Sequence, residues 1–358
     1  MRSSPTRPTE PQMDAAQIRL RRLRSHLLVE PAATVPDVAR RLFAVQAQDF
    51  AAGRWALGIR TSGGPAVGDV DRAFDAGLLV RAWTQRGTLH IVEPGSVGAI
   101  LDVTGERQTR AYGIDPGVLD RGERVFRSAL AAEAPLTRAA FVDALQRDGV
   151  AGSVAAGTRI LTALSIRGVL ALGPVVPRDE GVAREQYLVA LPPRGPAGDD
   201  PAVDLLVAYL RGHGPATGAD FAWWAGLPAG QARGAAGRAG DRVVALGGEL
   251  LDVPDEPTTA VPDPALPGTI ALPAFDEYVL SYADRSIGMG AGDRMSIGPT
   301  ANGMVRPVIL RGGVAVGTWS LSLAVGSSGI PAATLFDGES DAGVGDALAR
   351  VGGFFGRQ

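Results

Sequence analysis

Two similar stretches of sequence lie 80 residues apart: Pro135-Leu-Thr137-Arg-Ala139-Ala-Phe141 and Pro215-Ala-Thr217-Gly-Ala219-Asp-Phe221. In both, a threonine precedes apolar residues at helical spacing, where its hydroxyl can cap the first turn of a helix. A looser third copy is Thr34-Val-Pro36-Asp37-Val38-Ala39, with a proline early in the predicted helix, where a missing N–H is tolerated. The three copies indicate an internal repeat.

The segments around each copy have the same order of predicted elements. An amphipathic helix precedes each copy, over residues 15–29, 121–132 and 201–211. A short apolar strand follows each copy after a further helical stretch, over residues 78–80, 169–172 and 243–246. In the first copy the chain then returns as a hairpin around residues 85–87, and Gly247-Gly248 supplies the turn in the third. Helices followed by a hairpin are typical of a winged helix, a relative of the helix-turn-helix.

Beyond about residue 265 the pattern changes to short strands separated by Gly, Pro and Asn, over residues 269–272, 278–282, 304–310 and 314–323. The predicted fold is therefore α+β, with three tandem winged-helix units followed by a small C-terminal antiparallel β-sheet or barrel. The predicted boundaries are a disordered lead-in at 1–12, winged helices at 13–110, 111–192 and 193–264, and a β-rich domain at 265–358. Proline-rich stretches at 192–201 and 254–267 serve as linkers.

The composition of the chain excludes several kinds of catalytic and metal-binding site. The chain has 358 residues, 46% of them hydrophobic and 20% charged, as in a folded globular protein. No apolar run approaches the ~20 residues that span a bilayer, and we expect a cytoplasmic location. It contains no cysteine and only three histidines, which lie far apart in sequence, so we expect no cofactor and no metal site. All 35 basic residues are arginine, which excludes a lysine Schiff base.

Charge is distributed unevenly. The net charge is −3, which by itself argues against a nucleic-acid partner. Residues 1–110, however, hold 15 Arg against 11 Asp and Glu, a net of +4, whereas residues 191–280 hold 5 against 12, a net of −7. A phosphate-facing surface should therefore draw on the N-terminal unit. Its first helix carries a basic face that includes Arg22 and Arg24, which is either a solvated surface or a grip on phosphates.

Several short motifs occur in a distinctive order: Ala44-Val45-Gln46-Ala47-Gln48-Asp49, Arg81-Ala82-Trp83, Arg86-Gly87-Thr88-Leu89-His90, Leu272-Pro273-Ala274-Phe275-Asp276-Glu277-Tyr278 and Gly317-Thr318-Trp319. Together they resemble the AlkZ-like winged-helix DNA glycosylases, some of which protect antibiotic-producing bacteria from their own DNA-alkylating products. The resemblance implies three winged helices around a DNA-binding channel, a Gln-x-Gln catalytic signature at Gln46 and Gln48, and excision of purines alkylated at ring nitrogens from double-stranded DNA.

The spacing of the two glutamines constrains the local structure. Residues two apart on a regular helix point to nearly opposite sides, so Gln46 and Gln48 can share a pocket only if the segment up to Phe50 is irregular. The alternative working pair is Gln46 with Asp49, the one nearby residue that could act as a general base. A purely structural interpretation is that the glutamines cap or cross-link neighbouring helices. We favour the glutamine pair, with Asp49 in reserve.

The predicted hairpin offers further candidates. Arg81 and Arg86 are suited to phosphate contact, Trp83 could stack on a displaced base, and Thr88 and His90 alternate on one strand face. Alternatively, Trp83 fills the core and His90 only satisfies a buried carbonyl group. Farther along, adjacent Asp276 and Glu277 would point to opposite faces of a strand, which argues against a paired-carboxylate site.

The predicted function is that of a monofunctional, metal-independent and monomeric DNA glycosylase that excises N7- or N3-alkylated purines, with bulky natural-product adducts and crosslinks among the candidate substrates. Without lysine, no strand-cleaving lyase step is expected. The competing interpretations are a non-catalytic winged-helix regulator and a resistance protein that sequesters a drug. A typical regulator has one winged helix and a dimerisation or ligand module, whereas three copies and a C-terminal sheet fit a channel around DNA better.

Overall fold

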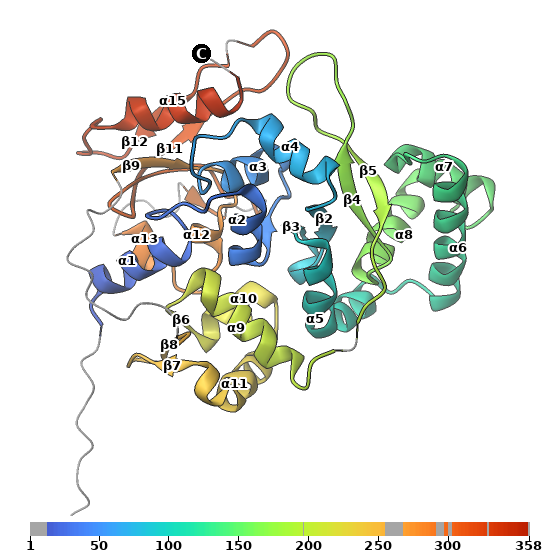
Figure 1. Cartoon of the computed structure of the whole chain (residues 1–358), viewed down its shortest axis with the longest axis horizontal. Coiled ribbons are helices and arrows are strands. Elements are labelled where there is room, and N and C mark those ends of the chain that lie inside the picture. The colour runs from blue at the N-terminus through green and yellow to red at the C-terminus, as the bar shows by residue number, and fades with distance from the viewer. Residues whose placement is uncertain are drawn as a thin grey trace, which may run out of the picture.

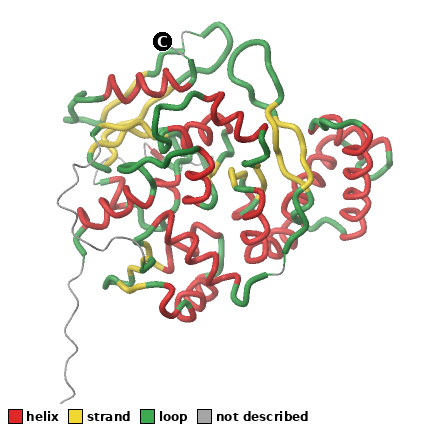
Figure 2. Tube along the Cα trace, viewed as in Figure 1, coloured by secondary structure: helices red, strands yellow, loops and turns green. Residues whose placement is uncertain are grey.

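The computed structural model describes residues 13–195, 197–254, 268–290, 297–299, 303–327 and 329–356. Helices and strands mix throughout these residues (Figure 1, Figure 2). Every strand pairing within their three sheets is antiparallel. The predicted mixed helix and antiparallel sheet class is therefore confirmed. The lead-in at 1–12 and the proline-rich stretch from 255 to 267 lie outside the described residues.

The N-terminal part alternates helices with three short strands. Its helices are α1 (Ala15–Ser25), α2 (Val35–Leu42), α3 (Phe50–Gly58), α4 (Val67–Asp75) and α5 (Val97–Tyr112), and its strands are β1 (Val45–Gln46), β2 (Val80–Trp83) and β3 (Leu89–Val92). Short 3-10 turns lie at η1 (Gln85–Gly87) and η2 (Pro94–Ser96). Thr34 caps α2 as predicted, because its hydroxyl accepts the N–H of Asp37 at 3.3 Å. The hairpin of β2, η1 and β3 also lies where the sequence indicated.

The two later repeats show the predicted threonine caps. The second comprises α6 (Pro116–Ala132), α7 (Arg138–Arg147), α8 (Val154–Ile166), β4 (Leu170–Val175) and β5 (Gln186–Ala190). The third comprises α9 (Pro201–His213), β6 (Ala216–Thr217), α10 (Gly218–Ala225), α11 (Ala229–Arg238), η3 (Gly240–Arg242), β7 (Val244–Ala245) and β8 (Leu250–Asp252). Thr137 accepts the N–H of Ala140 at 3.1 Å. Thr217 and Asp220 form a reciprocal capping box, with hydrogen bonds of 3.1 and 2.9 Å.

Strands from the first two repeats join in one sheet. The order is β1-β3-β2-β4-β5, and Arg81 of β2 pairs with Leu172 of β4 (Figure 1). An isolated two-stranded hairpin is marginal in water and leaves unpaired N–H and C=O groups on its outer strand, which the second hairpin satisfies here. The hairpins of the first two repeats therefore share one sheet. The third hairpin forms its own sheet, in the order β6-β8-β7.

The C-terminal part is a sheet with a helix packed on it. Its elements are β9 (Thr269–Leu272), α12 (Glu277–Leu280), α13 (Ser286–Met289), β10 (Val308–Arg311), β11 (Val314–Ser320), β12 (Ala332–Leu335) and α15 (Val344–Phe354). The strand order is β12-β11-β10-β9, and α15 covers one face (Figure 1). The predicted strand over residues 278–282 is wrong. The segment is the short helix α12 because the Asp276 side chain caps it, accepting the N–H of Tyr278 at 2.9 Å.

A buried ion pair ties this C-terminal part to the first one. Arg60 donates to both carboxylate oxygens of Asp276, at 2.7 and 2.8 Å, and both side chains are fully buried. Arg60 also donates to the carbonyl of His26 at 2.9 Å. The pair places the residue after Asp276 against the end of β1. Across the described ranges, no helix has the length and apolar character that crossing a bilayer requires.

The capping box of the third repeat supports a measurable prediction. Thr217→Ala removes the hydroxyl that accepts the N–H of Asp220, and we expect it to lower the free energy of unfolding by about 1 kcal/mol. Urea denaturation measures the change. Thr217→Ser keeps the hydroxyl and should lie close to the wild type. Equal losses for both variants would show that the methyl group, rather than the cap, stabilises this helix.

Candidate active site

Gln46 lies on an edge strand, not on a helix. Helix α2 ends at Leu42, Phe43 follows with φ of 63°, and β1 then pairs with β3 before α3 begins at Phe50. The positive φ at Phe43 turns the chain out of the helix, because left-handed backbone cannot continue a right-handed helix. The irregular segment that the glutamine spacing required is therefore present.

Gln46 and His90 are cross-strand neighbours. The register pairs Gln46 with His90, and the adjacent Ala47 donates its N–H to the carbonyl of Leu89 at 2.8 Å. Because hydrogen-bonded and non-hydrogen-bonded pairs alternate, Gln46 and His90 form a non-hydrogen-bonded pair whose side chains share one face at close spacing. The backbone N–H of Gln46 points away from the sheet, and the Glu277 carboxylate accepts it at 2.8 Å.

His90 is fully buried and neutral. Its Nδ1 lies 2.8 Å from the hydroxyl of Thr84 and 3.0 Å from the carbonyl oxygen of Thr88. A carbonyl oxygen only accepts, so Nδ1 carries the hydrogen and Nε2 presents a lone pair. Within the described residues Nε2 has no hydrogen-bond partner. Burial, followed by the charge of Arg86, lowers the pKa of His90 to about 3.

Arg86 points into the protein and fixes the amide of Gln46. It lies in η1 with φ of 56°. Its guanidinium donates to the Gln46 side-chain oxygen at 2.8 Å and also to the carbonyl of Trp224. Burial lowers the pKa of Arg86, and the charge of Glu277 opposes this effect. Arg86 therefore does not reach outward to a phosphate as predicted. The half-buried Thr88 shapes the same turn, with its hydroxyl 3.4 Å from the carbonyl of Gln85.

Glu277 is a site residue that the sequence analysis missed. One carboxylate oxygen accepts the Gln46 N–H, and the other accepts from Ser281 at 2.6 Å and from the Trp224 indole at 3.2 Å. His213 lies 3.5 Å from the same oxygen. Burial alone would raise the pKa of Glu277, but contact with His213 and the neighbouring positive charges lower it to about 2. The signal was the Leu272 to Tyr278 motif, which the wrong strand assignment concealed.

Gln48 and Asp49 lie at the surface beside this buried group. The Gln48 side-chain oxygen accepts the N–H of Leu89 at 3.2 Å, so both glutamines are anchored to β3 or its turn. Asp49 caps α3, accepting the N–H of Ala52 at 3.1 Å. A Cβ at Gly53 would lie 2.5 Å from the Ala47 Cβ, so the glycine lets α3 approach the segment between the glutamines. The Asp49 carboxylate is thus engaged at the helix start.

Arg81 and Trp83 lie on the opposite face of the sheet from Gln46 and His90. They alternate along β2 with Ala82, which pairs with His90. Trp83 is 8% exposed and packs in the core of the second repeat, so it is not available to stack on a base, and the structural alternative is correct. Arg81 is also buried, and it lines the same cavity of about 390 Å³ as Gln48 and Asp49.

The basic face of α1 is packed rather than solvated. Arg22 donates to the carbonyl of Pro215 at 3.0 Å, lies 3.6 Å from the Asp220 carboxylate, and covers the Tyr282 ring. Two nitrogens of the Arg24 guanidinium are likewise buried. Arg22 therefore does not form the predicted grip on phosphates, because its guanidinium packs against the acidic third repeat.

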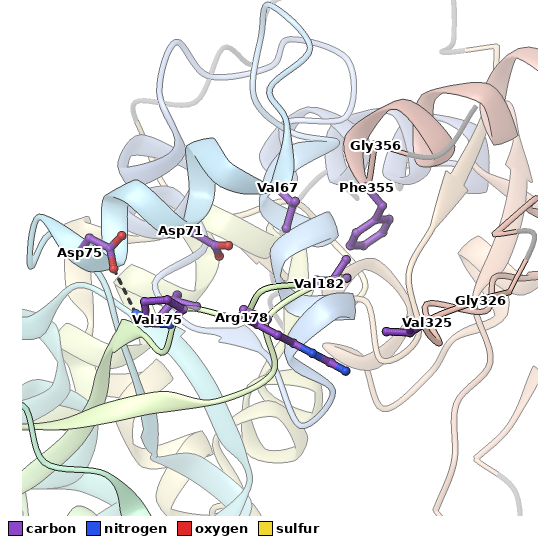
Figure 3. A pocket seen from close by; sticks show the side chains of 13 residues that line it. Val67, Asp71, Asp75, Val175, Arg178, Val182, Val325, Gly326, Phe355 and Gly356 are labelled. Atoms are coloured by element: carbon purple, nitrogen blue, oxygen red, sulfur yellow. Dashed lines mark hydrogen bonds between the residues drawn. The ribbon is translucent and has the colours of Figure 1, made fainter.

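A larger cavity of about 630 Å³ lies elsewhere, between α4, the β4–β5 loop and the end of α15. Figure 3 shows Asp75 of its wall joined to Val175, whose N–H donates to the carboxylate at 3.1 Å. None of the predicted site residues lines it. The described residues also contain no group of three or more His, Asp or Glu side chains placed to hold a metal ion.

Comparisons with known proteins identify the family of the chain. A family model described as DNA glycosylase AlkZ-like matches residues 39–354. The interstrand DNA cross-link repair glycosylase of Streptomyces sahachiroi is 28% identical over 314 residues, which are 80% of this chain and 81% of that protein. The solved structure of Streptomyces sahachiroi DNA glycosylase AlkZ is similar with a TM-score of 0.76 and 24% identity, covering 97% of this chain and 98% of the other. Because the family model spans most of the sequence, this protein belongs to the AlkZ-like family of DNA glycosylases.

Proposed function

We propose that this protein is a monomeric, cytoplasmic and metal-independent DNA glycosylase that releases purines alkylated at N7 or N3 from double-stranded DNA. The observation that carries the proposal is Gln46, which is held at a sheet edge by Arg86 and Glu277 beside the neutral His90. The related enzyme from Streptomyces sahachiroi is named for interstrand cross-link repair, so bulky adducts and crosslinks are included among the proposed substrates. We interpret residues 13–110, 111–192 and 193–264 as winged-helix units.

This reaction needs only modest catalysis, because its leaving group is already activated. A purine alkylated at N7 or N3 is positively charged, so the bond between the base and C1′ breaks with both electrons going to the base, which leaves neutral. The sugar develops oxocarbenium character, as in glycoside hydrolysis, and water adds to C1′ and loses a proton. No strong acid is needed to activate the leaving group. The protein has to place the water and stabilise the cationic sugar.

The glutamine amides are oriented for this task. The oxygen of Gln46 already accepts from Arg86, and that of Gln48 accepts from Leu89, so neither amide can flip without losing a bond. An amide oxygen has two lone pairs, and one on each remains for a water or the sugar. The NH₂ groups face away from these donors and can hold sugar or phosphate oxygens. We propose Gln46 and Gln48 as the catalytic pair, with Asp49 in reserve as the base.

Base release from alkylated duplex DNA tests the function. Wild-type protein in excess chelator should release free alkylated purine and leave an intact abasic strand, because a lyase step needs an amine nucleophile and the chain has no lysine. Chromatography detects the base, and a denaturing gel before and after alkali detects the abasic site. Binding without release would instead identify a DNA-binding protein that does no chemistry.

A further inference from the structure

The cavity beside Gln48 is lined by a buried arginine, Arg81, two of whose nitrogens have no hydrogen-bond acceptor. Arg81 is 6% exposed, and its Nε and one terminal nitrogen are buried without a hydrogen-bond acceptor anywhere in the described chain. The cavity of about 390 Å³ that Arg81 lines lies at the start of α3, and Arg184 of the β4–β5 loop lines it too. A buried guanidinium that lacks acceptors is rare, because each unmade hydrogen bond to a charged group is costly.

A neighbouring arginine has acceptors for both of its terminal nitrogens, although its Nε is buried without one. Arg54 and Arg81 both lie over the Phe50 ring, at 4.1 and 4.5 Å from its centroid. Arg54 donates twice to Asp71, at 2.8 and 3.0 Å, and once to the carbonyl of Ala183 at 2.6 Å. The structure gives Arg81 no equivalent of these acceptors.

The charges around Arg81 favour an added anion. Burial, followed by the like charges of Arg138 and Arg54, lowers the pKa of Arg81 to about 9, and the carboxylate of Asp49 opposes this only weakly. Two further carboxylates, of Asp143 and Glu185, line an adjoining cavity. Among the described residues, no salt bridge joins Arg81 to the carboxylate of Asp49, Asp143 or Glu185.

The start of α3 supplies the second element of an anion site. The first amide groups of a helix have no intrahelical acceptors, and the helix dipole favours negative charge at this end. Asp49 takes the N–H of Ala52 and its carbonyl takes that of Gly53, which leaves the amides of Phe50 and Ala51. Both of these residues line the cavity.

We propose that this cavity binds a phosphate group through Arg81, Arg184 and the first amides of α3, and that the phosphate belongs to the DNA strand carrying the damaged nucleotide. This assignment rests on the proposed glycosylase function. Gln48 lines the same cavity and is anchored to β3, so a phosphate held there sets the position of the sugar relative to Gln48. A free phosphate ion has the same chemistry and is the competing source.

Replacing Arg81 is expected not to lower the stability of the free protein. A residue that maintains the fold lowers stability when it is replaced. Arg81, in contrast, is an uncompensated buried charge in the free protein, so Arg81→Met, of similar length and apolar, should leave Tm unchanged or raise it. The same substitution should weaken binding, because a phosphate would lose its principal donor.

The experiment compares Arg81→Met, Arg81→Lys and, as a charge-matched control, Arg233→Met on the exposed surface of α11. Affinity for an unmodified duplex is measured over a salt series, and Tm is measured with and without inorganic phosphate. We expect Arg81→Met to bind duplex about tenfold more weakly, with a salt slope smaller by about 0.9, while Arg81→Lys recovers part of the affinity and the control keeps the wild-type slope.

Three outcomes would overturn the proposal. A lower Tm for Arg81→Met would assign the residue to folding. Wild-type duplex affinity and salt slope in Arg81→Met would exclude a DNA phosphate, and if phosphate also stabilised the wild type but not this variant, the site would belong to a free anion. A salt slope reduced equally in the Arg233 control would show only a general charge effect. Because the duplex is undamaged, these results do not depend on whether the wild type releases a base.

Discussion

Gln46→Ala is expected to lower the single-turnover rate of base release by about 100- to 1000-fold, the range found when one preorganised polar group is removed from an enzyme site. The alanine removes the amide that Arg86 orients and leaves that guanidinium without one of its acceptors. The backbone N–H still donates to Glu277, so the sheet edge is retained. Quenched-flow or manual time courses on duplex DNA with one alkylated purine measure the rate.

Two neighbouring substitutions separate the candidates within the motif. Gln48→Ala should also slow release, whereas Asp49→Asn should have a small effect, because the carboxylate of Asp49 is engaged as the cap of α3. Circular dichroism and a melting curve establish that each variant is folded. If both alanine variants retained full activity while Asp49→Asn lost it, the catalytic assignment would move from the glutamines to Asp49.

Glu277→Gln is expected to lower the free energy of unfolding by about 3–5 kcal/mol, as when one partner of a buried charge pair is removed. The two carboxylate oxygens accept from Gln46 on one side and from Trp224 and Ser281 on the other. A glutamine must turn its NH₂ toward one of these donors in either orientation, and it no longer balances the charge of Arg86. In protein that remains folded, base release should fall at least about tenfold, because the Gln46 N–H exchanges a charged acceptor for a neutral amide oxygen or for an NH₂ group that cannot accept.

The pH dependence distinguishes an ionised anchor from a merely well-packed one. The pKa of Glu277 is lowered to about 2, so its stabilising contribution is complete above the ordinary carboxyl pKa and is lost as the pH falls toward 2. The stability difference between wild type and Glu277→Gln should therefore be largest near neutral pH and shrink below about pH 4. Urea titrations across this range measure it, with exposed Glu133→Gln as the control. A difference independent of pH would contradict the ionised assignment.

Local features were the part of the fold that could be predicted. Thr34, Thr137 and Thr217 all cap helices, because a cap depends on a side chain and an N–H three residues away. The hairpin around η1 also lies close to its predicted position, because its two strands are joined by a short turn. The helix predicted over residues 15–29 is real but ends at Ser25. These interactions are complete within one turn of chain.

The errors share a different cause. The segment after Asp276 has the apolar composition of a strand but forms α12, capped by Asp276. Glu277 is brought into the site because Arg60 and Gln46, from distant parts of the chain, hold the carboxylates of Asp276 and Glu277. Arg22 looked like surface charge until the third repeat covered it. Whether such charged side chains are buried depends on which distant segments of the chain pack against them.

The sequence by itself determined the mixed class, the caps and the absence of lysine and cysteine chemistry, and it made a break in the helix near Gln46 a condition for the glutamine pair. Only the tertiary structure decided that Gln46 faces His90, that Arg86 turns inward, and that a carboxylate 231 residues away holds the Gln46 N–H. It also separated Arg81 from His90 onto opposite faces of one sheet. The reason is that caps and turns satisfy hydrogen bonds within a few residues, whereas the charge and hydrogen bonding of a buried site depend on groups that only folding brings together.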